Sequence, residues 1–203
     1  MNDINENSSS DHILVGKVLG GDTQGFSIII SQTERLVTQI VFKMITNTED
    51  RRDIAQDVYL KAFQKLSGFR FQSKLSTWIG QIAYNTCLNH LEKRRLVLAD
   101  KIFTDNDANK DLNDLEIFDK SISDFETDTP LIKKELSIIL QTEIDNLSPI
   151  YRTLITLYHT EEMSYSEIAE IIELPDGTVK NYLFRARKTL KEALLKKFKK
   201  DDL

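Results

Sequence analysis

The C-terminal part of the chain carries side chains suited to contact with nucleic acid. Residues 177–200 hold nine basic residues and one acidic residue. If this stretch is a helix, Val179, Leu183 and Leu190 share a face that must be buried. The opposite face then presents Lys180, Asn181, Phe184, Arg185, Lys188 and Lys191. Lysine and arginine donate to phosphates and guanine, asparagine pairs with adenine, and phenylalanine packs on thymine methyl groups. This pattern predicts a DNA-binding helix, with a basic, solvated C-terminal helix as the alternative.

A second basic stretch, residues 69–95, interleaves cations with aromatic rings. Its relevant side chains are Phe69, Arg70, Phe71, Lys74, Trp78, Tyr84, Lys93, Arg94 and Arg95. Rings that stack on unpaired bases, beside cations that attract phosphates, are typical of single-strand binding. The periodicity places Trp78 on the core face of a helix and directs Tyr84 away from it. For Phe69 and Phe71, in a predicted loop, base contact and simple packing are equal alternatives.

An acidic face is predicted between Glu49 and Leu66. A helix over this range buries a stripe that includes Ile54 and Val58. Its opposite side carries Asp53, Asp57, Leu60 and Gln64. An acidic face with a bare leucine suits the docking of another protein. The alternative is a solvated face with one stray leucine, since single exposed apolar residues are normal.

No constellation in the chain indicates catalysis. The three histidines, His12, His90 and His159, are far apart and have no metal-binding spacing. Cys87 is predicted to be a buried thiol. Gly20-Gly21 lacks the pattern of a phosphate-binding loop. We therefore expect no enzymatic activity, no small-molecule substrate, no cofactor and no metal.

The elements that position these side chains are predicted to be helices. Ser164-Tyr165-Ser166-Glu167 is a capping box that starts a short helix to about Glu173. Leu174-Pro175-Asp176-Gly177 then marks a turn, and a long helix follows from about Thr178 to Lys199. A short helix, a tight turn and a long basic helix form a helix-turn-helix, which can place its second helix in the major groove.

The other expected helices cover residues 23–46, 49–66, 74–95, 131–146 and 149–160, with Ser73 as a cap. The chain has 203 residues but only 7 glycines and 3 prolines, which favours long helices. We expect an all-α fold of two small helical domains, residues 11–96 and 131–200. An acidic flexible linker, residues 97–130, joins them, and the first ten residues are expected to be frayed.

Charge and hydropathy limit the classes of protein further. The net charge is −5, but residues 101–140 alone hold 5 basic and 10 acidic side chains. One cysteine allows no internal disulfide. The N-terminus has no apolar segment typical of a signal peptide, and no apolar run is long enough for a membrane helix. These observations predict a cytoplasmic protein that is not itself a membrane protein.

Three segments resemble the extracytoplasmic-function group of the sigma-70 family of sigma factors. Asp53–Phe63 and Thr77–Asn85 resemble two motifs of the first domain of that family, and Ser164–Leu190 resembles the motif of its last domain. The order of the motifs is the same, and the resemblance covers nearly the whole chain outside the termini and the linker. It implies a promoter-specificity subunit of bacterial RNA polymerase, with core polymerase and promoter DNA as partners.

The resemblance also implies roles for individual residues. Asp53, Gln56, Asp57 and Leu60 would dock on the clamp coiled coil of the polymerase. Phe69, Arg70, Tyr84 and Asn85 would contact the opened −10 element, and Lys93, Arg94 and Arg95 the DNA backbone. Lys180, Asn181, Phe184, Arg185 and Lys188 would contact the −35 element. The linker is similar to those that pass through the nucleic-acid channel of the polymerase. Members of the family often pair with an anti-sigma protein, which is therefore a candidate partner.

Three positions depart from the family pattern. Phe71 stands where a small residue is usual, and Pro175 replaces a common capping serine, which leaves Asp176 to supply the cap. Asn181-Tyr182 replaces a common Ser-Arg pair. We therefore expect a promoter preference different from the commonest one. The alternative function is a stand-alone regulator of LuxR type, whose DNA-binding helix would be the same.

Overall fold

The computed structural model describes residues 3–98 and 130–201, which form helices and no strands. The helices are α1 (Asp3–Leu19), α2 (Thr23–Met44), α3 (Thr48–Lys65), the 3-10 helix η1 (Leu66–Gly68), α4 (Leu75–Leu98), α5 (Pro130–Asp145), α6 (Pro149–His159), α7 (Tyr165–Ile172) and α8 (Asp176–Asp201). The predicted all-α fold is confirmed. Most of the predicted linker, residues 99–129, lies outside the described residues.

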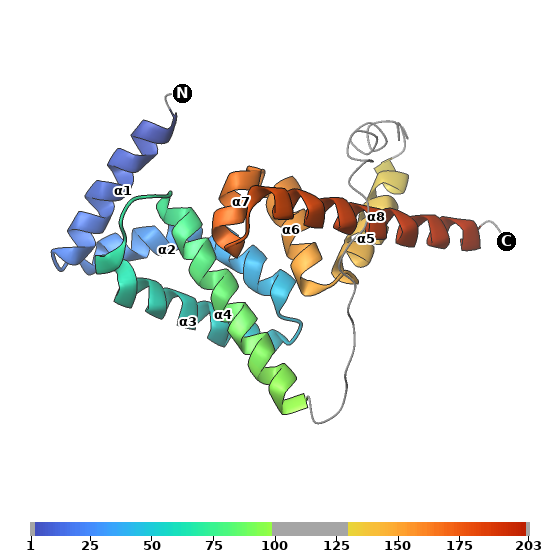
Figure 1. The fold of residues 1–203 in the computed structure, drawn as a ribbon, viewed down its shortest axis with the longest axis horizontal. Coiled ribbons are helices and arrows are strands. Elements are labelled where there is room, and N and C mark those ends of the chain that lie inside the picture. Colours follow the sequence, from blue (N-terminus) through green and yellow to red (C-terminus); the bar gives the residue numbers. More distant parts are fainter. Residues whose placement is uncertain (1–2, 99–129, 202–203) are drawn as a thin grey trace.

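Helices α1 to α4 form the N-terminal half of the structure (Figure 1). Helix α4 packs against both α2 and α3, and the core between them includes Ile40, Val58 and Ile79. Asp22 and Asn47 cap the starts of α2 and α3, because each side chain accepts a backbone N–H of the first turn. These three helices carry the predicted acidic face and the predicted single-strand-binding segment.

Helix α1 packs on α2, and it was not among the helices expected from the sequence. Residues 3–10 are helical rather than frayed. Leu14, Val15 and Val18 of α1 are buried, which anchors the helix. A Cβ atom at Gly25 would lie 2.9 Å from Val18, so the glycine permits the close contact between α1 and α2.

Helices α5 to α8 form the C-terminal half, and α7 and α8 are the helix-turn-helix. The predicted capping box is present: Ser164 and Glu167 each accept a hydrogen bond from the backbone of the other. Helix α8 begins at Asp176, two residues before the predicted start, because the Pro175 carbonyl accepts the N–H groups of Thr178 and Val179 at 2.8 and 3.1 Å. The apolar stripe predicted for α8 is buried.

The two halves pack directly against each other. Helix α7 lies against α4, and α6 lies against α2 (Figure 1). A Cβ atom at Gly80 of α4 would lie 3.0 Å from Ile171 Cδ1, so the absence of a side chain at Gly80 lets α7 approach closely. The sequence analysis did not predict this contact between the halves, which we call the closed arrangement.

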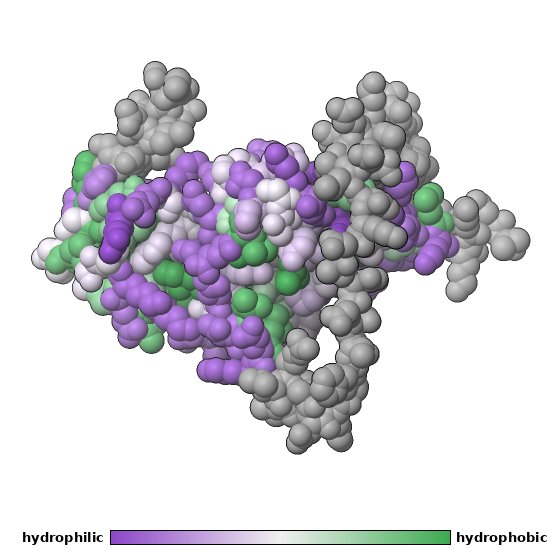
Figure 2. Space-filling view, viewed as in Figure 1, coloured by the Kyte–Doolittle hydropathy of each residue, from purple (hydrophilic) through white to green (hydrophobic). Residues whose placement is uncertain are grey.

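The visible surface is mostly hydrophilic, with apolar residues scattered over it (Figure 2). Within residues 3–98 and 130–201, no helix has the length and hydropathy needed to cross a membrane.

Candidate nucleic-acid interface

The outward face of α8 carries the side chains predicted to contact duplex DNA. Lys180 and Lys188 are exposed, and Asn181, Phe184 and Arg185 are partly exposed. The Lys180 ammonium lies over the Tyr165 ring of α7, 5.5 Å from its centroid. Because Val179, Leu183, Ala186 and Leu190 are buried on the other side, this face is held toward solvent.

Residues 69–74 form a loop between η1 and α4, and it contains the aromatic residues predicted to contact single-stranded DNA. Phe69 is only 7% exposed, and its ring centroid lies 5.1 Å from that of Trp78 and 4.7 Å from that of Phe71. Arg70 is exposed and Phe71 is partly buried. Phe69 therefore anchors the loop, whereas Arg70 is exposed and Phe71 is partly accessible.

On α4, the structure covers two predicted DNA-binding residues with the C-terminal half. Tyr84 is only 5% exposed, although periodicity directs it away from the core face of its own helix. Burial, with a smaller effect of Tyr182, raises the pKa of the Tyr84 hydroxyl. Asn85 donates its side-chain amide to Glu173 of α7 at 3.1 Å. Helical periodicity placed Tyr84 away from the core of its own half, and the other half covers that face.

At the end of α4, the predicted backbone-contacting cations are partly described. Lys93 and Arg94 are exposed. Arg94 donates a hydrogen bond to the Asp50 carboxylate at 3.2 Å. Arg95 is helical, and its side chain lies outside the described set.

The four residues predicted to bind polymerase lie on the exposed side of α3. Asp53, Gln56 and Leu60 are exposed, and Asp57 is partly exposed and pairs with Lys61 at 2.7 Å. The stripe of Ile54, Val58 and Ala62 is buried on the opposite side, as predicted. Leu60 is 56% exposed, and one turn further Phe63 is 50% exposed. Sequence analysis missed Phe63, although its position three residues after Leu60 places it on the same side of the helix.

Polar contacts join the two halves at several points. The Lys43 ammonium lies 2.7 Å from the Asp145 carboxylate, and Arg35 lies 3.1 Å from Glu161. The buried Arg152 donates to the carbonyl oxygens of Lys43 and Asp145. Glu173 was missed by sequence analysis, and it accepts hydrogen bonds from Gln81 at 2.7 Å and from Asn85.

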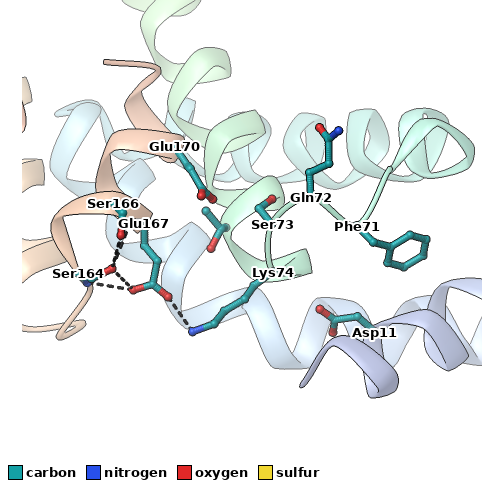
Figure 3. Close-up of a pocket in the computed structure, with 10 residues that line it drawn as sticks. Asp11, Phe71, Gln72, Ser73, Lys74, Ser164, Ser166, Glu167 and Glu170 are labelled. Atoms are coloured by element: carbon teal, nitrogen blue, oxygen red, sulfur yellow. Dashed lines mark hydrogen bonds and ion pairs between the residues drawn. The ribbon is translucent and has the colours of Figure 1, made fainter. Parts of the chain in front are cut away.

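A cavity of about 440 Å³ lies between the halves, beside the loop (Figure 3). Lys74 reaches across it and pairs with Glu167 at 2.7 Å. Burial alone would raise the pKa of Glu167, but hydrogen bonds from Lys74 and from Ser164 lower it. Burial and the neighbouring charges of Glu167 and Asp176 raise the pKa of Glu170.

Cys87 is a buried free thiol, as predicted. Burial raises the pKa of the Cys87 thiol to about 12, which disfavours the reactive thiolate. Within the part of the chain that the structure describes, no cluster of three His, Cys, Asp or Glu residues could hold a metal ion.

Comparison with known proteins identifies the family. A model of Sigma-70 region 2 matches residues 29–97, and a model of Sigma-70 region 4 matches residues 137–190. The RNA polymerase sigma-H factor of Pseudomonas aeruginosa is 30% identical, over 91% of this chain and 93% of its own length. The ECF RNA polymerase sigma-E factor of Haemophilus influenzae is 31% identical, over 91% of this chain and 95% of its own length. The chain belongs to the extracytoplasmic-function (ECF) group of the sigma-70 family.

A solved structure shares the fold of this sigma factor. The sigma factor RpoE of Bartonella quintana, solved in complex with the anti-sigma factor NepR, has a TM-score of 0.60. It is 21% identical, over 85% of this chain and 98% of its own length.

The family membership decides between the two functions considered from the sequence. Sigma factors are known as non-catalytic promoter-recognition subunits, and this chain is a promoter-specificity subunit of RNA polymerase. The stand-alone LuxR-type regulator is not favoured, because the N-terminal half matches region 2 of sigma factors.

Proposed function

We propose that this sigma factor divides its work among three surfaces. The exposed side of α3 docks on core polymerase through Asp53, Gln56, Asp57 and Leu60. The loop 69–74 and α4 hold the opened −10 element through Arg70, Phe71, Tyr84, Asn85, Lys93, Arg94 and Arg95, and the buried Phe69 anchors this loop. The outward face of α8 contacts the −35 element through Lys180, Asn181, Phe184, Arg185 and Lys188.

The α8 face is the observation that carries this proposal. It combines exposed cations with an amide and an aromatic ring, opposite a buried stripe, in the second helix of a helix-turn-helix. These are the groups that contact phosphates and base edges in the major groove. The loop and α4 support the second surface, because Arg70 and Phe71 are accessible beside the helix that carries Asn85.

The same proposal includes the domain limits and the partners. Residues 11–96 and 131–200 would act as the two binding units and residues 97–130 as the linker between them. Because the units are linked, weak contacts of each with promoter DNA reinforce one another. The sigma factor would act in the cytoplasm with RNA polymerase. An anti-sigma factor is a further proposed partner, supported by the fold that this chain shares with the NepR-bound sigma factor.

A transcription assay with purified core polymerase tests the three surfaces. The wild-type chain should co-elute with core enzyme and support run-off transcripts on fragments of the source genome. Arg185→Ala should weaken the effect of −35 substitutions by about 1–3 kcal/mol while core binding stays normal. Lys196→Ala, an exposed cation two turns or more beyond this face, is the matched control.

Two results would contradict the proposal. Equal loss of transcription from all −35 sequences in Arg185→Ala would make Arg185 a phosphate contact rather than a specificity residue. For the α3 surface, Asp57→Arg should abolish co-elution with core enzyme and leave the fold intact. The control, Glu192→Arg on α8, should still co-elute with core enzyme. Normal co-elution of Asp57→Arg would exclude α3 as the docking surface.

A further inference from the structure

The start of α4 is held by a residue from α1. The Leu75 N–H, in the first turn of α4, donates to the Asp11 carboxylate at 3.0 Å. The sequence analysis expected Ser73 to cap this helix, and Asp11 instead satisfies a first-turn N–H from a distant part of the chain. Figure 3 shows Asp11 on α1 below the segment that carries Ser73 and Lys74.

The next residue of α1 holds the other end of the same segment. The His12 ring stacks on the Phe71 ring, with 3.5 Å between centroids and 15° between planes. Phe71 in turn contacts Phe69, which packs on Trp78 of α4. His12 therefore extends a row of rings that begins in the core of the N-terminal half.

Phe71 needs such support because its backbone is unusual. Its φ is +55°, the left-handed region, which is costly for a bulky side chain. A residue persists in this conformation only where its surroundings hold it there. Asp11 and His12 are adjacent on a helix that is itself anchored by Leu14 and Val15, so they can fix both ends of residues 71–75 together.

We propose that Asp11 and His12 are positioning residues for recognition of the −10 element. By holding residues 71–75 in one conformation, they set where Arg70 and Phe71 meet the DNA and thus which −10 sequences are accepted. Both residues precede the segment matched by the region 2 model, which begins at residue 29. The inference rests on the proposed −10 contact of the loop.

The test uses the full chain bound to core polymerase and a set of templates with a fixed −35 element and randomised −10 positions. In His12→Ala and Asp11→Ala, the ranking of −10 sequences should shift, by about fivefold for the most affected base. Core binding and the dependence on the −35 element should not change. Lys17→Ala, an exposed residue on the same helix, is the matched control and should behave as wild type.

Conservative variants separate positioning from stability. His12→Phe keeps a ring that can stack on Phe71, and Asp11→Asn keeps an oxygen that can accept the Leu75 N–H. Both should restore the wild-type ranking of −10 sequences. If His12→Ala and Asp11→Ala instead lower transcription equally for every −10 sequence, their role is only structural and the inference is overturned.

Phe71→Gly in the same assay distinguishes failure of this inference from failure of the proposed function. A changed ranking in Phe71→Gly, with no change in the α1 variants, would exclude Asp11 and His12 and leave the loop as the −10 surface. An unchanged ranking in Phe71→Gly would exclude the loop itself, and the inference with it.

Discussion

At Phe71 the backbone favours glycine, while the side chain is held by aromatic contacts. Phe71→Gly and Phe71→Ala both remove the contacts with His12 and Phe69. Only alanine must still bear the left-handed backbone, which costs about 1–2 kcal/mol. We therefore expect Phe71→Gly to be more stable than Phe71→Ala by about 1 kcal/mol in urea unfolding. Equal stabilities would mean that the loop leaves the left-handed conformation once the ring is removed.

The burial or exposure of a single residue was predictable from the sequence where it depends only on the residue's position in its own helix. Periodicity alone placed Val179 and Leu183 in the core and Lys180 in solvent, because α8 is amphipathic. It failed at Tyr84, because a face that is polar within one half can be covered by the other. The left-handed backbone of Phe71 was not predicted, because the residue type argues against it, although the small residue usual at this position in the family is compatible with such a backbone.

At the scale of elements, α7 depends on Glu167 in two ways. The Glu167 carboxylate completes the capping box with Ser164, and it pairs with Lys74 across the cavity. Glutamine can also complete a capping box, so Glu167→Gln keeps the cap and removes the charge. Both side chains of the pair are partly exposed, so the variant should lose less than about 1 kcal/mol of stability at pH 7.

The pH dependence of this loss follows from the pKa of Glu167. Because the folded state lowers this pKa, the stabilisation is complete above about 4.5, the ordinary pKa of glutamate. It disappears as the pH falls through the lower, folded value. The difference in unfolding free energy between wild type and Glu167→Gln should therefore shrink below pH 4.5. The raised pKa of Glu170 acts in the opposite direction, and Glu167→Gln removes the part of this shift that the charge of Glu167 causes.

Urea unfolding of both proteins at a series of pH values measures this difference. Glu192→Gln, an exposed glutamate on α8, is the control and should show no such trend. A difference that stays constant down to pH 3 would show that the charge of Glu167 does not stabilise the folded state.

Helix limits were largely predictable, and the exceptions have local causes. The starts expected from the capping box and at residues 131 and 149 agree with those of α7, α5 and α6 within one residue. Helix α8 starts earlier than predicted because the Pro175 carbonyl serves as its first acceptor. The early part of α1 was missed because its residues are polar, and its docking on α2 could not be inferred from its own composition.

For the whole molecule, the closed arrangement was the part that the sequence did not predict. Nothing in the sequence around Gly80 indicates an interface. Its role became visible only in the structure, where it lies in close contact with Ile171 of the other half. The polar contacts between the halves join residues that are about 90 positions or more apart, such as Gln81 and Glu173. The predicted linker suggested that the two halves are independent units, whereas in the structure α4 packs against α7 and α2 packs against α6.

The closed arrangement is in conflict with the proposed −10 contact, and Glu173 is the residue where this can be tested. Its carboxylate accepts a hydrogen bond from the side-chain amide of Asn85, which is therefore not available to DNA. Its backbone ends α7 in the left-handed region, with φ +56°. Glycine is the residue that favours this position at a helix end. Glu173→Gly therefore removes both hydrogen bonds to α4 and relieves the backbone, whereas Glu173→Ala removes the bonds alone.

Both variants should favour an open arrangement, in which Asn85 is free, by about fivefold, because the two lost hydrogen bonds are exposed and together contribute about 1 kcal/mol. Small-angle X-ray scattering should then give a larger radius of gyration for both. Only Glu173→Ala should also lose stability in urea, by about 1 kcal/mol relative to Glu173→Gly. An unchanged radius of gyration in both would show that apolar packing, such as that of Ile171 on Gly80, keeps the halves together. In that case, binding to polymerase or DNA, rather than the loss of Glu173, would have to separate them.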